Sequence, residues 1–166
     1  MRIPIVNEQD EIIKIIDSTD RQKSDICRVS ALWVTDRDGN VLLAQRSFSK
    51  KFSPGLWGPA VAGTLEEGET YESNILKEAQ EEINLVGIKP NKENKTRMST
   101  THEYFCQWFS VVVDGGYPFV KQDSEVEKVK WFTKEELLKL FADKPEIFVQ
   151  SFKYLVNYFI KHANQS

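Results

Sequence analysis

The chain has 166 residues, of which 40% are hydrophobic and 28% are charged, and its formal net charge is −3 at pH 7. This length suits one domain with a buried core, so we expect a single domain over residues 1–166. The near balance of charges argues against a nucleic-acid partner. No apolar stretch approaches the ~20 residues that a membrane span requires, so we expect no membrane partner either.

The N-terminal residues and the cysteines bear on the cellular location of the protein. Charged and polar residues interrupt the first thirteen positions, where a secretory signal would need an apolar run. The only two cysteines, Cys27 and Cys106, are far apart and outside any metal-ligand spacing. Two buried free thiols are favoured over a disulfide, and this predicts a cytoplasmic location.

The first half of the chain is rich in strand signals. Branched residues alternate with turn residues, and Asp38-Gly39 is a strong hairpin signal between two apolar runs. In chain order we expect two short strands within 3–17, a polar connector over 17–25, strands over 26–34 and 41–47, a loop over 48–58 and a strand over 59–63.

A helix should follow from Thr70, a good N-cap, to about Ile83. Four apolar residues recur at helical spacing and predict its buried face. They are Ile75, Leu76, Ala79 and Ile83.

The second half of the chain mixes strands and helices. Thr133 and Glu136 have the spacing of a capping box, and Pro145 suits the start of a final amphipathic helix. We expect an exposed polar segment over 91–97, a long strand over 99–113, a turn over 114–118, a strand over 126–132 and helices over 133–141 and 144–163. This order indicates one α/β fold with about three helices.

The segment from Gly63 to Leu85 contains seven glutamates and one basic residue, Lys77. Three of the glutamates are spaced i, i+3 and i+4 and share one helix face, near the C-terminal end where the helix dipole favours cations. Their mutual repulsion should raise at least one carboxyl pKa. A divalent cation such as Mg²⁺ or Mn²⁺ would relieve this repulsion, and a solvated acidic face is the alternative. The three are Glu78, Glu81 and Glu82.

The same segment resembles the Nudix box, in which a glycine is followed at fixed spacing by a glutamate, a basic-acidic pair, two glutamates, a glycine and an aliphatic residue. The matching residues are Gly63, Glu69, Lys77, Glu78, Ala79, Glu81, Glu82, Asn84 and Leu85. Flanking segments also resemble Nudix proteins, so the resemblance extends from about Val6 to Phe141. It implies an α/β/α sandwich on a mixed sheet.

The resemblance implies a hydrolase that cleaves a phosphoanhydride bond with Mg²⁺ or Mn²⁺ as cofactor. The substrate class is a nucleoside di- or triphosphate, or a nucleoside diphosphate linked to another group X. In the family pattern Glu78 and Glu82 are metal ligands, Glu81 is a third ligand or holds metal-bound water, the Gly63 carbonyl adds an oxygen, and Glu69 braces the helix through Lys77.

Two positions depart from the resembled motif. Asn84 replaces glycine after the helix, where a left-handed conformation is expected, and asparagine tolerates this conformation. Lys77 replaces arginine, which keeps the charge but loses the planar fork of donors. We therefore expect the fold to be retained, with a looser orientation of Glu69 and Glu78 and reduced activity.

Hydrolysis also needs a base that takes a proton from water. Glu78 is the first candidate. His102 beside Glu103 is the second, and a packing role for His102 is the alternative.

The phosphates of a substrate need cationic contacts. Arg46 is the best candidate, since a guanidinium binds phosphate oxygens at two points, and Lys50 and Lys51 follow in the next loop. The alternative for both lysines is a solvated loop. Among the aromatic residues, for which core packing is the alternative, Trp57 is the candidate for substrate contact because it lies in the expected loop.

Two rival functions remain open. The segments before the box also resemble isopentenyl-diphosphate isomerases, but Ala62 stands where that resemblance requires the catalytic cysteine, and Thr64 stands where it requires a metal-binding histidine. A non-catalytic nucleotide-binding module is the other rival, because Lys77 departs from the motif. The sequence leaves open the leaving group and whether the chain is a monomer or a homodimer.

Overall fold

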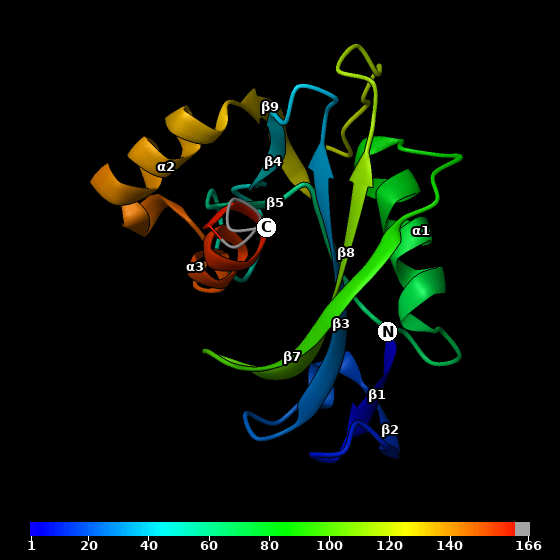
Figure 1. Ribbon diagram of the computed structural model, residues 1–166. Helices are drawn as coiled ribbons and strands as arrows, with labels where there is room; N and C mark the ends of the chain where they lie inside the picture. The colour runs from blue at the N-terminus through cyan, green and yellow to red at the C-terminus, as the bar shows by residue number, and fades with distance from the viewer. Residues whose placement is uncertain (162–166) are drawn as a thin grey trace.

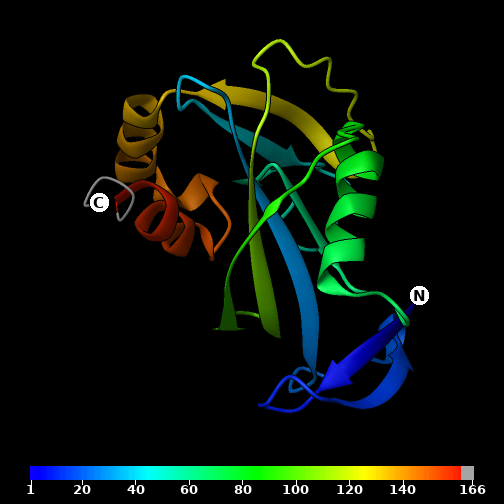
Figure 2. The same ribbon diagram turned by 45° about the vertical axis from the view of Figure 1, so that its right-hand side comes forward.

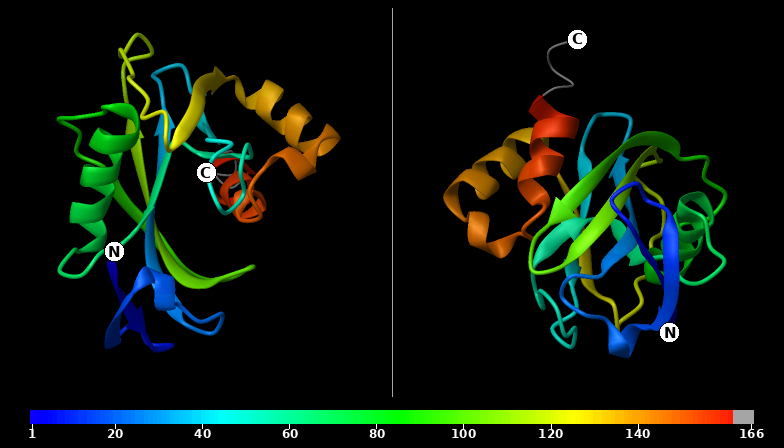
Figure 3. Two further views of the ribbon diagram at one scale, coloured as in Figure 1. Left: turned by 180° about the vertical axis from the view of Figure 1, so that it is seen from behind. Right: turned by 90° about the horizontal axis from the view of Figure 1, so that it is seen from below.

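The computed structural model describes residues 1–161, whose strands form one mixed sheet with helices on both faces (Figure 1, Figure 2). Helix α1 covers one face, and α2 and α3 lie together on the other (Figure 3). The expected α/β/α sandwich on a mixed sheet is therefore confirmed.

The strands are β1 Arg2–Val6, β2 Ile12–Asp17, β3 Ile26–Thr35, β4 Val41–Arg46, β5 Trp57–Pro59, β6 Val61–Thr64, β7 Asn91–Ser99, β8 Glu103–Val112 and β9 Val126–Phe132. The helical elements are η1 Ser18–Asp20, α1 Tyr71–Ile83, α2 Lys134–Asp143, η2 Pro145–Ile147, α3 Phe152–Leu155 and η3 Val156–Lys161.

Strand β3 is the centre of the sheet. It runs parallel to β8 over its whole length, from the Ile26–Glu103 pair to the Thr35–Val112 pair. It pairs antiparallel with β4, β6 and the end of β1, and this combination gives the sheet its mixed character. Strand β6, which begins the acidic segment, is thus fixed directly beside the central strand.

The side chains of β3 alternate between two core layers, as a strand buried on both faces requires. Ala31 and Trp33 pack in the layer covered by α2 and α3, which also contains Phe152. Leu32 and Val34 pack in the layer covered by α1. Each helical layer therefore has its own apolar contact with the sheet, and the helices are held on opposite faces.

Two sequence expectations in the second half were incomplete. The polar segment 91–97 belongs to strand β7, which pairs antiparallel with β8. Its side chains are largely exposed, so its sequence lacks the apolar alternation that predicts strands. The long strand expected over 99–113 begins at Glu103, because Thr100 and His102 form a tight turn between β7 and β8.

The prediction of a single final helix over 144–163 was wrong. The chain forms η2, becomes extended at Phe148, and then continues as α3 and the π-helical η3. Phe148 is buried and forms a parallel bridge with Trp57, and the Val149 N–H donates to the Trp57 carbonyl at 2.9 Å. These contacts with the sheet edge interrupt the helix. Residues 162 and 163 of the expected helix lie outside the described residues.

Candidate functional site

Helix α1 begins and ends at the residues that its sequence predicts. The Thr70 hydroxyl accepts from the Ser73 N–H at 3.0 Å, and the Ser73 hydroxyl accepts from the Thr70 N–H at 2.9 Å, which makes a reciprocal capping box. At the other end Asn84 is left-handed, with φ 54° and ψ 35°, as expected where asparagine replaces glycine. The acidic segment therefore forms a helix with two well-defined ends.

The buried face of α1 differs at one position from the expected set. Ile75, Ala79 and Ile83 are fully buried against the sheet, whereas Leu76 is 43% exposed and was wrongly assigned to this face. Leu76 lies beyond the edge of the sheet-facing stripe, and the polar side chain of Asn74 is buried in its place. Glu82 is also on the sheet side, with 9% exposure.

The acidic face of α1 packs closely against strand β6. The Glu82 carboxylate lies near the Ala62 backbone N–H, and the Glu78 carboxylate lies over Gly63. Glu81 is exposed at the rim of the same cavity. From Glu82 through Glu78 to Glu81, the three α1 carboxylates that line the cavity are thus increasingly exposed.

Burial and mutual repulsion raise the pKa of two of these carboxylates. Burial raises the pKa of Glu82 to about 8, and the charges of Glu78 and Glu125 raise it too. Burial likewise raises the pKa of Glu78 to about 7, against a lowering by Lys77 and with further raising by Glu81 and Glu69. This confirms the expected direction of at least one carboxyl pKa in the cluster.

Lys77 lies among the acidic residues that precede and form the helix. Its Nζ is 2.5 Å from Glu69 Oε1, 3.1 Å from Glu66 Oε1 and 3.8 Å from Glu78 Oε1. The structure therefore brings Lys77 and Glu69 together, as the resemblance implied.

Glu125 is a fourth carboxylate that the sequence did not indicate. It lies just before β9, and the pairing of Arg46 with Val126 brings it beside the end of β4. Its carboxylate forms an ion pair with Lys50, and it contributes to the raised pKa of Glu78 and Glu82. The 114–125 segment has no periodicity, so only the strand pairing could have revealed this residue.

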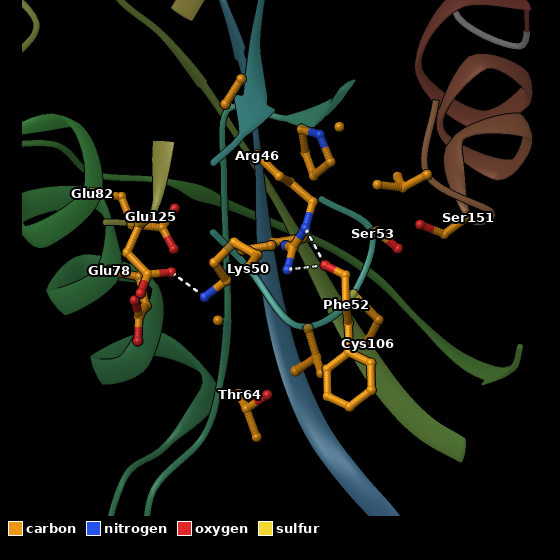
Figure 4. A pocket seen from close by; sticks show the side chains of 18 of the residues that line it. Arg46, Lys50, Phe52, Ser53, Thr64, Glu78, Glu82, Cys106, Glu125 and Ser151 are labelled. Carbon is orange, nitrogen blue, oxygen red and sulfur yellow. Dashed lines mark hydrogen bonds and ion pairs between the residues drawn. The ribbon is translucent and has the colours of Figure 1, made fainter. Parts of the chain in front are cut away.

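A cavity of about 510 Å³ lies between α1, the sheet and the loop over residues 47–56. Its lining includes Lys50 and the four carboxylates of Glu78, Glu81, Glu82 and Glu125. Figure 4 shows Glu78, Glu82 and Glu125 on one side, with Lys50 pointing toward them. The expected site residues that line this cavity are Arg46, Lys50, Gly63, Glu78, Glu81, Glu82 and His102.

Arg46 closes the 47–56 loop. Its Nε and Nη2 donate to the Phe52 carbonyl at 3.1 and 3.0 Å (Figure 4). The guanidinium therefore fixes the loop that carries Lys50, and it also lines the cavity wall.

Two candidates for substrate contact lie elsewhere. Trp57 belongs to strand β5, is 8% exposed and packs edge-on against Phe132 in the core, so its assignment to a loop and to substrate contact is corrected. The antiparallel pairing of β5 with β4 draws this residue inward. Lys51 is exposed, with Nζ 5.4 Å from the Phe52 ring centre, and does not line the cavity.

His102 lies at one end of the cavity. This end is lined by the β7–β8 turn and by the segment before α3. Its ring packs edge-on against Phe52, with the centroids 4.5 Å apart, and its Nδ1 is 3.1 Å from the Thr101 hydroxyl. Burial lowers the pKa of His102, and Arg21 lowers it further. Glu103 instead pairs with Arg97 at 2.6 Å, so the expected His102–Glu103 pair does not act as a unit.

An α/β/α sandwich that presents a capped acidic helix to a cation-bearing loop is the architecture that the resemblance to Nudix proteins implied. The NUDIX domain model matches residues 27–152. The chain belongs to the Nudix family.

Relatives agree with this assignment. A Nudix hydrolase of Yersinia pestis is 29% identical over 141 residues, covering 81% of this chain and 74% of that protein. The Nudix hydrolase YfcD of Escherichia coli K12 is 28% identical over 138 residues, covering 81% and 75%. An isopentenyl-diphosphate Δ-isomerase of Photobacterium profundum is 27% identical over 129 residues, covering 74% and 72%. Both branches indicated by the resemblance are therefore represented.

The fold has a near match among solved structures. The crystal structure of DR0079 from Deinococcus radiodurans superposes with a TM-score of 0.81 at 26% identity, covering 95% of this chain and 98% of that chain. Within residues 1–161, no helix is both long and apolar enough to cross a membrane.

Proposed function

We propose that this protein hydrolyses a phosphoanhydride bond in a nucleoside di- or triphosphate, or in a nucleoside diphosphate linked to another group, with Mg²⁺ or Mn²⁺. The observation that carries the proposal is that Glu78, Glu82 and Glu125 lie together on one cavity wall, with Lys50 directed at them and paired with Glu125. With Glu81 and Arg46, the cavity lining has four carboxylates and two cationic side chains. The carboxylates can hold a metal cation and the cationic side chains can hold phosphate oxygens, which are the two needs of diphosphate chemistry.

The donor set fits a hard divalent cation. Glu78, Glu81, Glu82 and Glu125 offer only carboxylate oxygens, which Mg²⁺ and Mn²⁺ prefer. As arranged within residues 1–161, no group of three or more acidic, histidine or cysteine side chains is close enough together to hold a metal ion, so the carboxylates would have to converge on it. A bound ion would be held by Glu78 and Glu82 with Glu81 or its waters, and by the Gly63 carbonyl. It would neutralise phosphate charge and lower the pKa of bound water.

The protein's own residues would hold the substrate. Lys50 is already directed at the carboxylates and would exchange its contact with Glu125 for a phosphate oxygen. Arg46 would support the loop and contribute its remaining donors. Lys51 and Trp57 are excluded from this role by their positions.

Glu78 is the first candidate for the base that accepts the proton of the attacking water. It lies on the cavity side of α1 and contacts Lys77 only at 3.8 Å. His102 is the second candidate, but it packs on Phe52, which lies across the cavity from Glu78 (Figure 4).

The test is a phosphate-release screen across nucleotides, nucleotide sugars and isopentenyl diphosphate with Mg²⁺ or Mn²⁺. We expect hydrolysis by the parent and a loss of at least about 100-fold in Glu82→Gln, as for removal of a group that stabilises charge in a transition state. Glu72→Gln is the matched control, since Glu72 is in the same helix but pairs with Lys92 on the surface.

The other outcomes identify the rivals. Migration of the double bond in isopentenyl diphosphate would favour the isomerase, to which the Photobacterium relative points. Ala62 and Thr64 line the cavity where that chemistry would need cysteine and histidine, and Cys106 is buried with a pKa raised well above its usual value. Metal-dependent nucleotide binding without turnover would favour a binding module.

A further inference from the structure

Glu69 precedes α1, and both of its carboxylate oxygens are held by neighbouring residues. Lys77 Nζ lies 2.5 Å from Oε1. Oε2 accepts from Asn74 Nδ2 at 2.8 Å and from the Glu66 backbone N–H at 2.8 Å. The lysine therefore holds one oxygen, and an amide and a backbone group hold the other.

Asn74 connects three elements of the structure. Its Nδ2 also lies 3.3 Å from the Thr64 carbonyl at the end of β6, and its Oδ1 accepts from the Ser30 hydroxyl of β3 at 2.5 Å. Asn74 and Ser30 are both fully buried. The Asn74 side chain thus joins β3, β6 and Glu69.

A buried asparagine at this position needs a reason beyond helix formation. An apolar residue would favour the helix more and would need no hydrogen-bond partners in the core. The amide is nevertheless fully engaged, since both its donor and its acceptor atoms have partners. Its hydrogen bond to Glu69 lies beside Lys77, where the resembled motif has arginine.

Lysine and arginine hold a carboxylate differently. A guanidinium presents parallel donors that grip both oxygens, whereas an ammonium is a point charge on a flexible stem. With lysine at position 77, the second oxygen of Glu69 would lack a side-chain donor unless another residue supplied one. Asn74 Nδ2 is that donor.

We propose that Asn74 is a positioning residue that shares the holding of Glu69 with Lys77, so that amide and ammonium together provide the two-point grip that one arginine would provide alone. The grip fixes the segment between Gly63 and Glu78, whose carboxylate lies over that glycine. The consequence for metal affinity rests on the proposed function, whereas the coupling between Asn74 and Lys77 does not.

The test is a cycle of variants in a Ser30→Ala background, which removes the hydroxyl that Asn74→Ala would leave unpaired. The four proteins are S30A, S30A/N74A, S30A/K77R and S30A/N74A/K77R. The two proteins that carry N74A have apolar groups in place of both partners of the buried Ser30–Asn74 hydrogen bond, which limits the cost. S30A and S30A/K77R leave the Asn74 Oδ1 without its donor, so S30A is the reference and the urea midpoints show whether each protein folds. Mn²⁺ affinity is measured by electron paramagnetic resonance, and stability by urea unfolding.

Arginine should rescue the loss of the amide. We expect S30A/N74A to bind Mn²⁺ about tenfold more weakly than S30A, the lower end of the cost of losing an outer-shell partner. S30A/N74A/K77R should return to within about threefold of S30A, and its urea midpoint should recover in parallel. K77R should change affinity little when Asn74 is present. A residue that merely fills space would give the same loss with lysine and with arginine, and that result would overturn the proposal.

The two readouts separate this inference from the proposed function. If S30A and the parent bind no Mn²⁺, the proposed function is wrong, and the urea midpoints alone decide whether Asn74 and Lys77 are coupled. Additive midpoints would overturn the coupling. Asn74→Ser in the parent background, where Ser30 is retained, provides a second variant, because it keeps a hydroxyl partner for Ser30 while its side chain ends one bond earlier.

Discussion

The carboxylate of Glu78 lies so close to Gly63 that no side chain fits between them. A Cβ placed on Gly63 would stand 2.5 Å from the Glu78 carboxyl carbon and 2.7 Å from its Oε1. Gly63 also pairs with Ser30 in the sheet, so the strand cannot easily move away. Any larger residue at position 63 would therefore displace the Glu78 side chain from β6.

This contact predicts the effect of Gly63→Ala. The methyl group should push Glu78 away from β6 and reduce Mn²⁺ affinity and phosphate release by about tenfold or more, in keeping with the precision that a reacting geometry needs. Isothermal titration with Mn²⁺ and the release assay measure the effect. Gly115→Ala is the control, since its Cβ would meet only Asp36 at 3.4 Å. Equal effects of the two substitutions would contradict the prediction.

The raised pKa of Glu82, about 8 against an ordinary 4.5, predicts how stability depends on pH without metal. Between these values the folded chain binds more protons than the unfolded chain, so the free energy of unfolding falls as pH rises. Glu82→Gln removes this slope and should raise Tm at pH 8 by about 2–8 °C, or roughly 1–2 kcal/mol for a chain of this size. Calorimetry in EDTA at several pH values measures it.

Adding Mn²⁺ provides a second test of the protonation of Glu82. Binding requires the carboxylate form, so Mn²⁺ should stabilise the parent more at pH 8 than at pH 6 and should release protons. A parent protein whose metal-free stability rises between these pH values would show that Glu82 is already ionised.

Lys50 and Lys51 are adjacent in sequence but should differ in effect. Lys50 points into the cavity and pairs with Glu125, whereas Lys51 is exposed against Phe52. Lys50→Met should raise KM about tenfold with a smaller effect on kcat, because it removes a contact made in both ground and transition states. Lys51→Met should change KM less than twofold. Similar KM values for the two variants would argue that Lys50 does not reach the phosphates.

The buried cluster around Asp10 should contribute substantially to the free energy of unfolding. The Asp10 carboxylate, 7% exposed, accepts from Arg28 at 2.7 Å, from Lys95 at 2.6 Å and from Tyr71 at 3.0 Å. Asp10→Asn keeps a residue that tolerates the left-handed φ of 61° but leaves Arg28 without its charge partner. We expect a loss of about 3 kcal/mol in urea unfolding.

The control for this variant is Asp38→Asn in the exposed hairpin turn. Burial raises the pKa of Asp10, but hydrogen bonds from Lys95, Arg28 and Tyr71 outweigh burial and lower it overall. The stability that this carboxylate contributes is therefore present above its ordinary pKa and is lost as pH falls. A loss no larger than that of Asp38→Asn would show that the cluster contributes little.

The sequence by itself determined the elements whose signals are local. Thr70 and Ser73 fix the start of α1, Asn84 fixes its end, and the spacing of Glu78, Glu81 and Glu82 places them toward one side. The capping box of Thr133 and Glu136 likewise predicted α2. These features depend on atoms only a few residues apart, so their physics can be deduced from neighbours in the chain.

Only the tertiary structure decided which residues meet from distant segments. Pairing of β4 with β9 brought Glu125 to Lys50, pairing of β4 with β5 drew Trp57 into the core, and the bridge from Trp57 to Phe148 broke the last helix. The exposed strand β7 and the buried Asn74 were also hidden from pattern reading. In each case the deciding free energy comes from backbone pairing or burial against a segment remote in sequence, and no local pattern of residues encodes that partner.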